Sequence, residues 1–384
     1  MSMIHDLHVS RGPAAAFAAV GVFWGSFAAL VPVIKPQVGL SDGAFGLALL
    51  VASIGAVLAM WLAPLAERTL GMRGLPVLTG CLALAVLLPA HATGGVTFAL
   101  AMLAVSAASG TLDVAMNGRV SVLESQVGRS LMNLNHAVFS VAYAGSAIAT
   151  GLAREAGFGP TLVLGIVAFV IALLIVQVAR ALVPDPDLSD TDVQTAPLPW
   201  ALLLPGGLII LIAFVSEQAT EGWSALYLER NLGAGAAQGA LGPAILGLTM
   251  AAGRLAGQVV ANRLSERHVI RWAATTAGAG AIIAATAPSL WVAYAGFAIL
   301  GLGVSVVAPM AYAWIGRIVP NRHRSHAISR ISVVGYTGFF IGPPMMGFLS
   351  EAFGLWVSFL AIGGILFIVP LVLVPILIRR PREV

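Results

Sequence analysis

The chain has 384 residues, of which 59% are hydrophobic and 9% charged. Soluble domains carry about 25% charged residues, so this composition excludes a soluble protein and indicates an integral membrane protein. The formal net charge of +4 does not indicate nucleic-acid binding, because membrane topology by itself leaves an excess of basic residues in loops. The single cysteine, Cys81, lies in an apolar stretch and excludes a disulfide framework.

Apolar stretches of about 20 residues, the length of a helix that crosses the hydrocarbon core of a bilayer, recur along the whole chain. The first, near 14–34, is longer than the core of a typical signal peptide and therefore predicts a membrane span. In chain order the twelve predicted helices are 14–34, 43–66, 75–92, 95–118, 130–153, 160–182, 199–228, 238–261, 268–287, 290–316, 326–350 and 354–378.

The loop arginines predict the orientation of these spans. With a cytoplasmic N-terminus, most of the basic loop residues fall on the cytoplasmic side, and Lys35, Arg154 and Arg230 fall on the other side. By the positive-inside rule this bias predicts that both termini are cytoplasmic. We expect a multi-pass monomer in the lipid bilayer of the cell inner membrane.

A polar connector, "VPDPDLSDTDVQTAPLP", separates six predicted helices from six. Its Pro, Asp and Ser residues are typical of a solvated linker. We therefore divide the chain into a six-helix bundle at 1–182, a cytoplasmic linker at 183–198 and a second six-helix bundle at 199–384. The predicted fold class is an all-α membrane protein of two bundles.

The two halves resemble each other at an offset of about 195 residues. The segment "GLAREAGFG" at 151–159 matches "GFLSEAFG" at 347–354, which pairs Glu155 with Glu351. Two copies of a six-helix unit are typical of transporters that rock one bundle against the other about a central site.

An acid interrupts the fourth predicted span in "GTLDVAMNGR", where Asn117 follows Asp113 by one helical turn. A charge at the bilayer centre costs about 2.5–3.5 kcal/mol on insertion scales, so an intramembrane acid is by default a functional candidate. We expect Asp113 to couple protons near the cytoplasmic side of a cavity, with Asn117 binding solute. The alternative for Asp113 is a structural hydrogen bond between spans.

Two further acids, Glu217 and Glu221, lie four residues apart in the seventh span and therefore share one helix face. Two carboxylates this close in a poorly solvated place do not ionise independently, and such a pair is suited to holding a proton. We predict a proton-coupling role for both. The alternative is that Glu221, near the outer end beside Trp223, sits in water at the mouth of the cavity.

Polar residues at helical spacing form a ribbon in the fifth span, and Asn135, His136 and Tyr143 are its candidates for solute binding. Trp24 and Trp223 occupy roughly corresponding places in the two halves. Aromatic side chains that face a cavity stack on sugar rings, so both are solute-binding candidates. The alternatives are a hydrogen-bonded structural histidine and tryptophans that anchor the membrane interface.

Arg254 and Arg330 are left inside predicted spans, and we interpret both as structural. The alternative for Arg254 is a contact with the substrate or with a carboxylate. The sequence has no glycine-rich phosphate loop in a nucleotide-binding context, no metal-ligand cluster and no nucleophile triad. We therefore expect no enzymatic activity, no cofactor and no metal, and an ion gradient as the driving force.

The whole pattern resembles the major facilitator superfamily, through two six-span halves, a central hydrophilic loop and a paired loop after spans two and eight. The first loop, "APLAERTLGMR", follows the loop pattern of the family, with Ala63 where the family usually has Gly and one extra residue before Gly71. The second, "GQVVANRLSER", has Asn262 in place of the acid. The resemblance implies a cytoplasmic latch that gates the two bundles. Its residues are Glu67, Arg68, Arg73, Gly257 and Arg263.

Four further segments are similar to the fucose permease-like branch of sugar and proton symporters and to its uncharacterised bacterial relatives. They are "LDVAMNGRVSVLE", "GRSLMNLNHAVFSVAYAGSA", "SEQATEGWSALYL" and "VGYTGFFIGPPMMGFLSE". In that branch an acid in span four, followed by Asn four residues later, is the proton-coupled position, which implies this role for Asp113 beside Asn117. The second acid of that branch, in span one, is absent from "VGVFWGSFAALVP".

These observations predict a secondary transporter that imports a small polar solute, such as a sugar, together with protons by alternating access. Two alternatives stay open. The first is a proton-coupled exporter of amphipathic compounds, although the glycine and proline motif of drug antiporters is missing from span five. The second is a membrane sensor that binds a ligand without transporting it.

Overall fold

The computed structural model describes residues 3–181, 200–261, 264–320 and 323–379, and its regular elements in these ranges are all helices. The first half contains α1 (Met3–Val9), α2 (Arg11–Gln37), α3 (Asp42–Leu70), α4 (Gly74–Ala85), α5 (Gly95–Val127), α6 (Met132–Glu155) and α7 (Pro160–Arg180). The second half contains α8 (Trp200–Leu232), α9 (Ala236–Ala261), α10 (Glu266–Ala285), α11 (Leu290–Ile318), α12 (Arg324–Phe353), α13 (Leu355–Ile368) and α14 (Val374–Arg379). The predicted linker at 183–198 lies outside the described residues.

Each half holds six long helices within the described ranges, once the short α1 is set aside and α13 is joined through a π-helical stretch, Val369–Leu373, to α14. By length and hydropathy 10 stretches qualify as membrane spans. Asp42–His91 counts there as one stretch although it contains both α3 and α4, and α10 is too polar because Arg267 and Arg271 lie in its first two turns. The predicted all-helical fold is confirmed. Helices suit a bilayer because they satisfy their own backbone hydrogen bonds.

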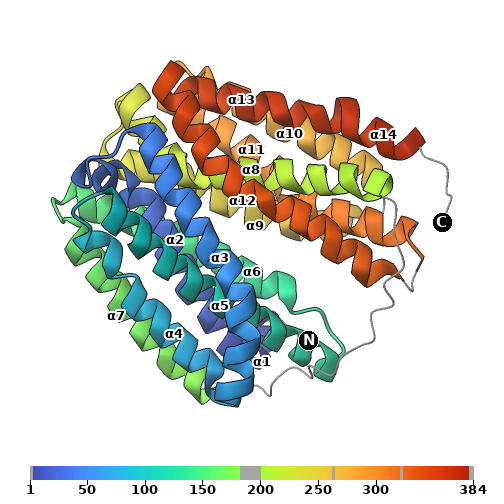
Figure 1. Cartoon of the computed structure of the whole chain (residues 1–384), viewed down its shortest axis with the longest axis horizontal. Helices are drawn as coiled ribbons and strands as arrows, with labels where there is room; N and C mark the ends of the chain where they lie inside the picture. The colour runs from blue at the N-terminus through green and yellow to red at the C-terminus, as the bar shows by residue number, and fades with distance from the viewer. Residues whose placement is uncertain (1–2, 182–199, 262–263, 321–322, 380–384) are drawn as a thin grey trace.

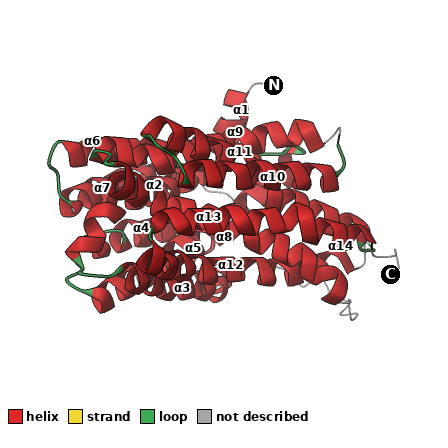
Figure 2. Cartoon of the chain, turned by 90° about the horizontal axis from the view of Figure 1, so that it is seen from above, coloured by secondary structure: helices red, strands yellow, loops and turns green. Residues whose placement is uncertain are grey.

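The two halves form two bundles that touch at one end and diverge toward the other. Figure 1 shows the first half (blue to green) and the second half (yellow-green to red) meeting at upper left and separating toward lower right, where both chain ends lie. Seen from above in Figure 2, the helices run roughly along one direction. We call the end that holds the two termini the terminal end, and the opposite end the distal end.

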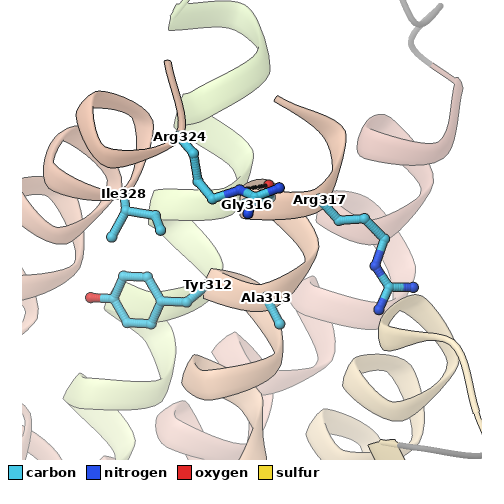
Figure 3. Close-up of a pocket in the computed structure, with 6 residues that line it drawn as sticks. All are labelled: Tyr312, Ala313, Gly316, Arg317, Arg324 and Ile328. Atoms are coloured by element: carbon cyan, nitrogen blue, oxygen red, sulfur yellow. Dashed lines mark hydrogen bonds between the residues drawn. The ribbon is translucent and has the colours of Figure 1, made fainter. Parts of the chain in front are cut away.

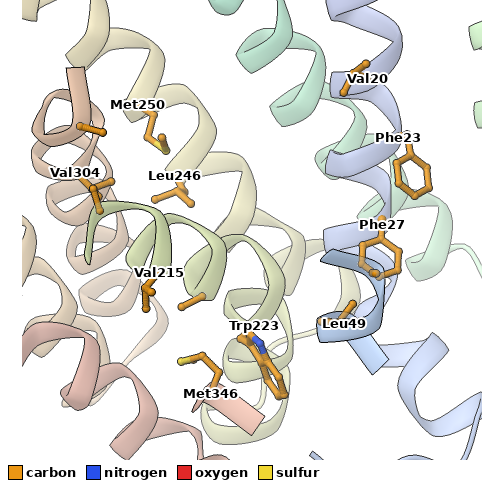
Figure 4. Packing of buried hydrophobic residues seen from close by; sticks show 14 of the residues in the cluster. Val20, Phe23, Phe27, Leu49, Val215, Trp223, Leu246, Met250, Val304 and Met346 are labelled. Carbon is orange, nitrogen blue, oxygen red and sulfur yellow. The ribbon is translucent and has the colours of Figure 1, made fainter. Parts of the chain in front are cut away.

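Close packing within the first half depends on glycine. At Gly21 and Gly25 of α2, an added Cβ would collide with the backbone of Phe139 and Tyr143 on α6. Small residues let membrane helices approach until their backbones are nearly in contact. The larger apolar side chains then fill the interior, and Figure 4 shows Phe23 and Phe27 of α2 among them.

The two halves contact each other along α6 against α9 and α3 against α12. Small side chains line the first of these contacts, where Ala147 of α6 lies in one buried cluster with Ala240 and Ala244 of α9. Ion pairs join the halves at the distal end: Arg154 Nη1 lies 2.7 Å from Glu229 Oε1. The distal end is therefore held closed by both packing and charge.

A second ion cluster at the distal end gathers around Asp42, the first residue of α3. Lys35 Nζ lies 2.7 Å from its Oδ1, and Arg230 Nη1 of the second half lies 2.5 Å from its Oδ2. The hydroxyl of Ser350, also from the second half, donates to the same carboxylate. Asp42 is buried, and two cations and a hydroxyl take the place of the water that would otherwise solvate its carboxylate.

Candidate functional site

An ion pair joins two helices of the second half. Arg254 of α9 donates through Nη2 to Glu217 Oε1 of α8 at 3.1 Å, and the two side chains are 25% and 22% exposed. Such partial burial weakens screening by solvent, so the pair interacts more strongly than one on a water-exposed surface. The sequence indicated a structural Arg254 and did not pair it with Glu217. The two residues come from different helices, which no local pattern reveals.

Glu221 and Tyr143 complete this group. Glu221, one turn beyond Glu217, interacts electrostatically with Glu217 and with Arg254. Tyr143 belongs to α6 of the first half and interacts with both glutamates. Its side chain is 1% exposed, and its hydroxyl has no hydrogen-bond partner among the described residues. The group thus combines two acids, one cation and a phenol at the junction of the two halves.

His136 lies two turns from Tyr143 on α6. It is half-buried, its ring packs edge-on against Phe17 of α2 with the centroids 4.9 Å apart, and it interacts electrostatically with Arg254. Asn135 is placed differently: it is fully buried, and its Nδ2 donates to Leu131 O at 2.9 Å. The predicted ribbon therefore brings His136 and Tyr143 toward the charged group, whereas Asn135 is packed inside the protein.

Asp113 and Asn117 lie on α5, and the side chain of Asp113 is exposed. Asn117 Nδ2 donates to the backbone oxygen of Asp113 at 2.8 Å and to its carboxylate Oδ1 at 3.2 Å. The charge of Asp113 also acts on Tyr336 of α12, in the second half.

An aromatic group stands beside Tyr336, which the sequence did not single out. Phe214 of α8 stacks on Tyr336 with centroids 5.6 Å apart and on Phe339 with centroids 4.9 Å apart. Tyr336 is 38% exposed and offers both a ring edge and a hydroxyl. The wall around Tyr336 is consequently aromatic, a surface suited to the apolar face of a ring.

A cavity of about 400 Å³ opens at the terminal end between α11 and α12. It is lined by Tyr312, Ala313, Gly316, Arg317, Arg324 and Ile328 (Figure 3). Arg324 Nε donates to Gly316 O at 2.6 Å, and the hydroxyl of Tyr312 accepts from Ser332 Oγ at 3.1 Å. Tyr312 also interacts with Tyr336, so the cavity borders the aromatic wall.

The two predicted tryptophans lie at the ends of one chain of aromatic contacts. Trp24 packs on Phe27, Phe27 on Phe98, Phe98 on Phe45 and Phe45 on Trp223, with centroids 5.4–6.4 Å apart. Trp24 is half-buried, whereas Trp223 is 1% exposed and sits in the buried core that Figure 4 shows. Because Phe45 belongs to the first half, Trp223 packs across the interface between the halves.

The predicted latch residues lie at the terminal end of α3 and in the turn that follows. Glu67 is buried, and Arg68 and Arg73 are exposed. Gly257 lies in α9, and Arg263 lies outside the described residues. Because Arg263 is not described, the contacts of the complete latch are not tested, and the latch stays a prediction.

Arg119 anchors the turn after α3. Helix α5 was predicted to end at 118 but continues to Val127, which leaves Arg119 inside the helix and 1% exposed. Its Nη2 donates to Gly71 O in the α3–α4 turn at 3.1 Å.

Arg330 lies near the terminal end of α12, where its guanidinium carbon is 5.3 Å from the centroid of the Trp200 ring at the start of α8. This contact joins two helices of the same half, as expected of a structural arginine. Among the described residues no group of three or more His, Cys, Asp or Glu side chains is placed to hold a metal ion.

Two helical bundles with a polar, charged group at their junction define a membrane transporter rather than an enzyme. Comparison with known proteins gives the family. Residues 206–384 match the Major Facilitator Superfamily. An uncharacterised MFS-type transporter of Yersinia pestis is 31% identical over 350 residues, which cover 90% of this chain and 89% of that protein. The chain belongs to the major facilitator superfamily.

Solved structures share the fold. A bacterial homolog of the human lysosomal transporter Spinster, in an inward-facing and occupied conformation, superposes with a TM-score of 0.75 at 16% identity, covering 94% of this chain and 95% of that one. The nucleoside transporter NupG superposes with a TM-score of 0.76 at 13% identity, covering 97% and 100%. At these identities the likeness establishes the architecture, and the solute has to be inferred from the site itself.

Proposed function

We propose that the protein is a secondary active transporter that imports a small polar solute, with sugars as the first class to test, together with protons. The observation that carries the proposal is the Glu217–Arg254 ion pair, with Glu221 and Tyr143 beside it at the junction of the halves. The sequence resemblance to fucose permease-like symporters supports the coupling acid at Asp113, whose charge acts on Tyr336 of the second half.

Coupling follows from the charges in this group. Arg254 and the two glutamates together carry one excess negative charge when both acids are ionised. A proton on Glu217 or Glu221 removes that excess, so the group becomes neutral and is cheaper to enclose in a low-dielectric interior. The same reasoning applies to Asp113, whose bare charge opposes closure of the second half over it.

Solute binding uses the groups that surround the acids. The Tyr143 hydroxyl has no hydrogen-bond partner among the described residues and can donate or accept. Asn117 supplies an amide oxygen, because its Nδ2 already donates to Asp113, and Tyr336 supplies a second phenol from the opposite half. Hydroxyl-rich solutes match such a set of neutral donors and acceptors. The aromatic wall of Phe214 and Tyr336 suits the apolar face of a sugar ring.

The conformation corresponds to one state of the transport cycle. If both termini are cytoplasmic, as the arginine distribution predicts, the closed distal end faces outward and the diverging terminal end faces the cytoplasm (Figure 1). This geometry corresponds to an inward-facing state, in which an importer releases its solute and an exporter loads it.

The test begins with a ligand screen. Purified protein is heated with sugars, organic acids, nucleosides and amino acids at two pH values, because a true ligand raises the unfolding temperature by mass action. Uptake of the best ligand is then measured in proteoliposomes with and without an inward proton gradient. The expected result is gradient-driven accumulation that Asp113→Asn and Glu217→Gln abolish.

A matched control is Asp6→Asn. It removes an acid whose Oδ2 lies 2.7 Å from Arg129 Nη2 at the terminal end and which is not part of the proposed site. Its uptake should equal that of the unmodified protein. Uptake that is equally fast without a proton gradient, or unchanged in Asp113→Asn, contradicts the proton coupling. Resistance to amphipathic compounds on expression would favour the exporter, and binding without counterflow would favour the sensor.

A further inference from the structure

Two glutamates at the distal end each reach from one half into the other. Glu155, the last residue of α6, accepts through Oε2 a hydrogen bond from the backbone N–H of Ala237 at 3.1 Å. Glu351, near the end of α12, accepts through Oε2 from the backbone N–H of Gly43 at 2.6 Å. The carboxylates therefore contact helix starts that belong to the opposite half.

The two contacts occupy equivalent positions, and Glu351 Oε2 also accepts from Ser41 Oγ at 2.8 Å. Ala237 is the second residue of α9 and Gly43 is the second residue of α3, so each glutamate caps the same position of its helix. The first N–H groups of a helix have no partner within the helix, and the positive end of the helix dipole attracts a carboxylate. The repeat that aligns Glu155 with Glu351 in the sequence thus places both at matching contacts.

The residue that precedes each glutamate strengthens its contact. Arg154 Nη2 pairs with Glu229 Oε2 of the opposite half at 2.9 Å. In the other copy, Ser350 donates its hydroxyl to Asp42 of the opposite half. Each copy therefore holds the other half through two consecutive side chains, one that caps a helix and one that reaches an acid.

Both contacts require the halves to touch. An added Cβ at Gly151, one turn before Glu155, would lie 2.5 Å from Cβ of Ala240. An added Cβ at Gly43 would lie 2.6 Å from the carboxylate of Glu351. Helices that separate by a few ångströms lose these hydrogen bonds outright, because such bonds weaken steeply beyond about 3.2 Å.

We propose that Glu155 and Glu351 are a matched pair of gate residues that close the distal end by capping α9 and α3 of the opposite halves. Opening the distal end replaces both caps with water. The two caps lie on separate helix pairs, so removing one leaves the other half of the gate in place. The inference relies on the movement of the halves in the proposed function, and on neither the solute nor the coupled ion.

The test measures opening directly. The single native cysteine is replaced in Cys81→Ser, and Ala244→Cys adds a thiol at a position that is 1% exposed between α9 and α6. In detergent-solubilised protein without solute, the rate of labelling by a hydrophilic maleimide reports how often the distal end opens. Because one exposed hydrogen bond is worth about threefold in an equilibrium, Glu155→Ala should raise the rate about threefold. Glu351→Ala loses the hydrogen bonds from Gly43 and Ser41 and should raise it about tenfold, and the double variant about thirtyfold.

Gln238→Ala is the matched control. Gln238 Oε1 accepts from Gly235 N at 3.1 Å, so it caps the same end of α9 from within its own half and should leave the labelling rate unchanged. Glu155→Gln and Glu351→Gln keep the size of the side chain and serve if the alanine variants do not fold; they should raise the rate less than alanine does. An unchanged rate in the double variant, or an equal rise in Gln238→Ala, overturns the proposal. Loss of proton-driven uptake has no bearing on this readout.

Discussion

Tyr143→Phe separates a functional hydroxyl from a structural one. The side chain is 1% exposed, and it packs tightly: an added Cβ at Gly247 of the opposite half would lie 2.9 Å from its ring. Its hydroxyl nevertheless has no partner among the described residues. A buried polar group left without a hydrogen bond destabilises the folded state by about 1–3 kcal/mol. Removing the oxygen while keeping the ring should therefore stabilise the protein by about 1 kcal/mol or more.

The same change should weaken solute binding. In the proposed function the hydroxyl is satisfied by the solute, and a typical hydrogen bond contributes about 0.5–1.5 kcal/mol. This loss corresponds to a dissociation constant raised about twofold to thirteenfold. Tyr143→Phe should thus unfold at a higher temperature without ligand, and it should gain less stability from the ligand than the unmodified protein does.

The assay is thermal unfolding in detergent with and without the ligand found by screening. Tyr227→Phe is the matched control, because the Tyr227 hydroxyl is also buried but donates to Ala284 O at 2.9 Å. That variant loses the hydrogen bonds of the hydroxyl to Ala284 O and Ala285 O and should be less stable. If Tyr143→Phe is destabilised as much as Tyr227→Phe, the Tyr143 hydroxyl has a structural partner and the reasoning is wrong.

Five further variants test the site and its packing. Glu217→Gln and Arg254→Leu should each abolish coupled uptake. A double-mutant cycle on the free energy of unfolding should give an interaction energy of about 0.5–3 kcal/mol between the two side chains. Additive effects of the two changes would contradict a direct ion pair. Trp223→Ala should destabilise the protein by about 3–5 kcal/mol, whereas the half-buried Trp24→Ala should chiefly weaken ligand binding; equal unfolding temperatures would argue against the interface role of Trp223. Gly25→Ala should destabilise the protein by about 1–3 kcal/mol, because the added Cβ would meet the backbone of α6. Size-exclusion chromatography should then show less folded protein, and a normal yield would show that α2 can shift.

Hydropathy predicted the helices because it depends on residues that are neighbours in the chain. The repeat supported the division into halves because it depends on residues that recur at a fixed offset. Interactions between helices were harder to predict. The Glu217–Arg254 pair joins α8 to α9, and its geometry depends on how the two helices rotate about their axes. Likewise, spacing alone grouped Asn135 with Tyr143, but the packing of α6 turned Asn135 into the protein, where its amide bonds Leu131.

The reciprocal glutamate caps have an evolutionary consequence. In a symmetric dimer of one six-helix unit, a residue that contacts a site on its partner finds its own copy of that site contacted in return. Glu155 on α9 and Glu351 on α3 have this arrangement within a single chain. A half-length ancestor could thus have closed its entrance as a homodimer before duplication and fusion. The residue before each glutamate is Arg154 in one copy and Ser350 in the other. Such a difference is expected once the two halves are fused and can change independently.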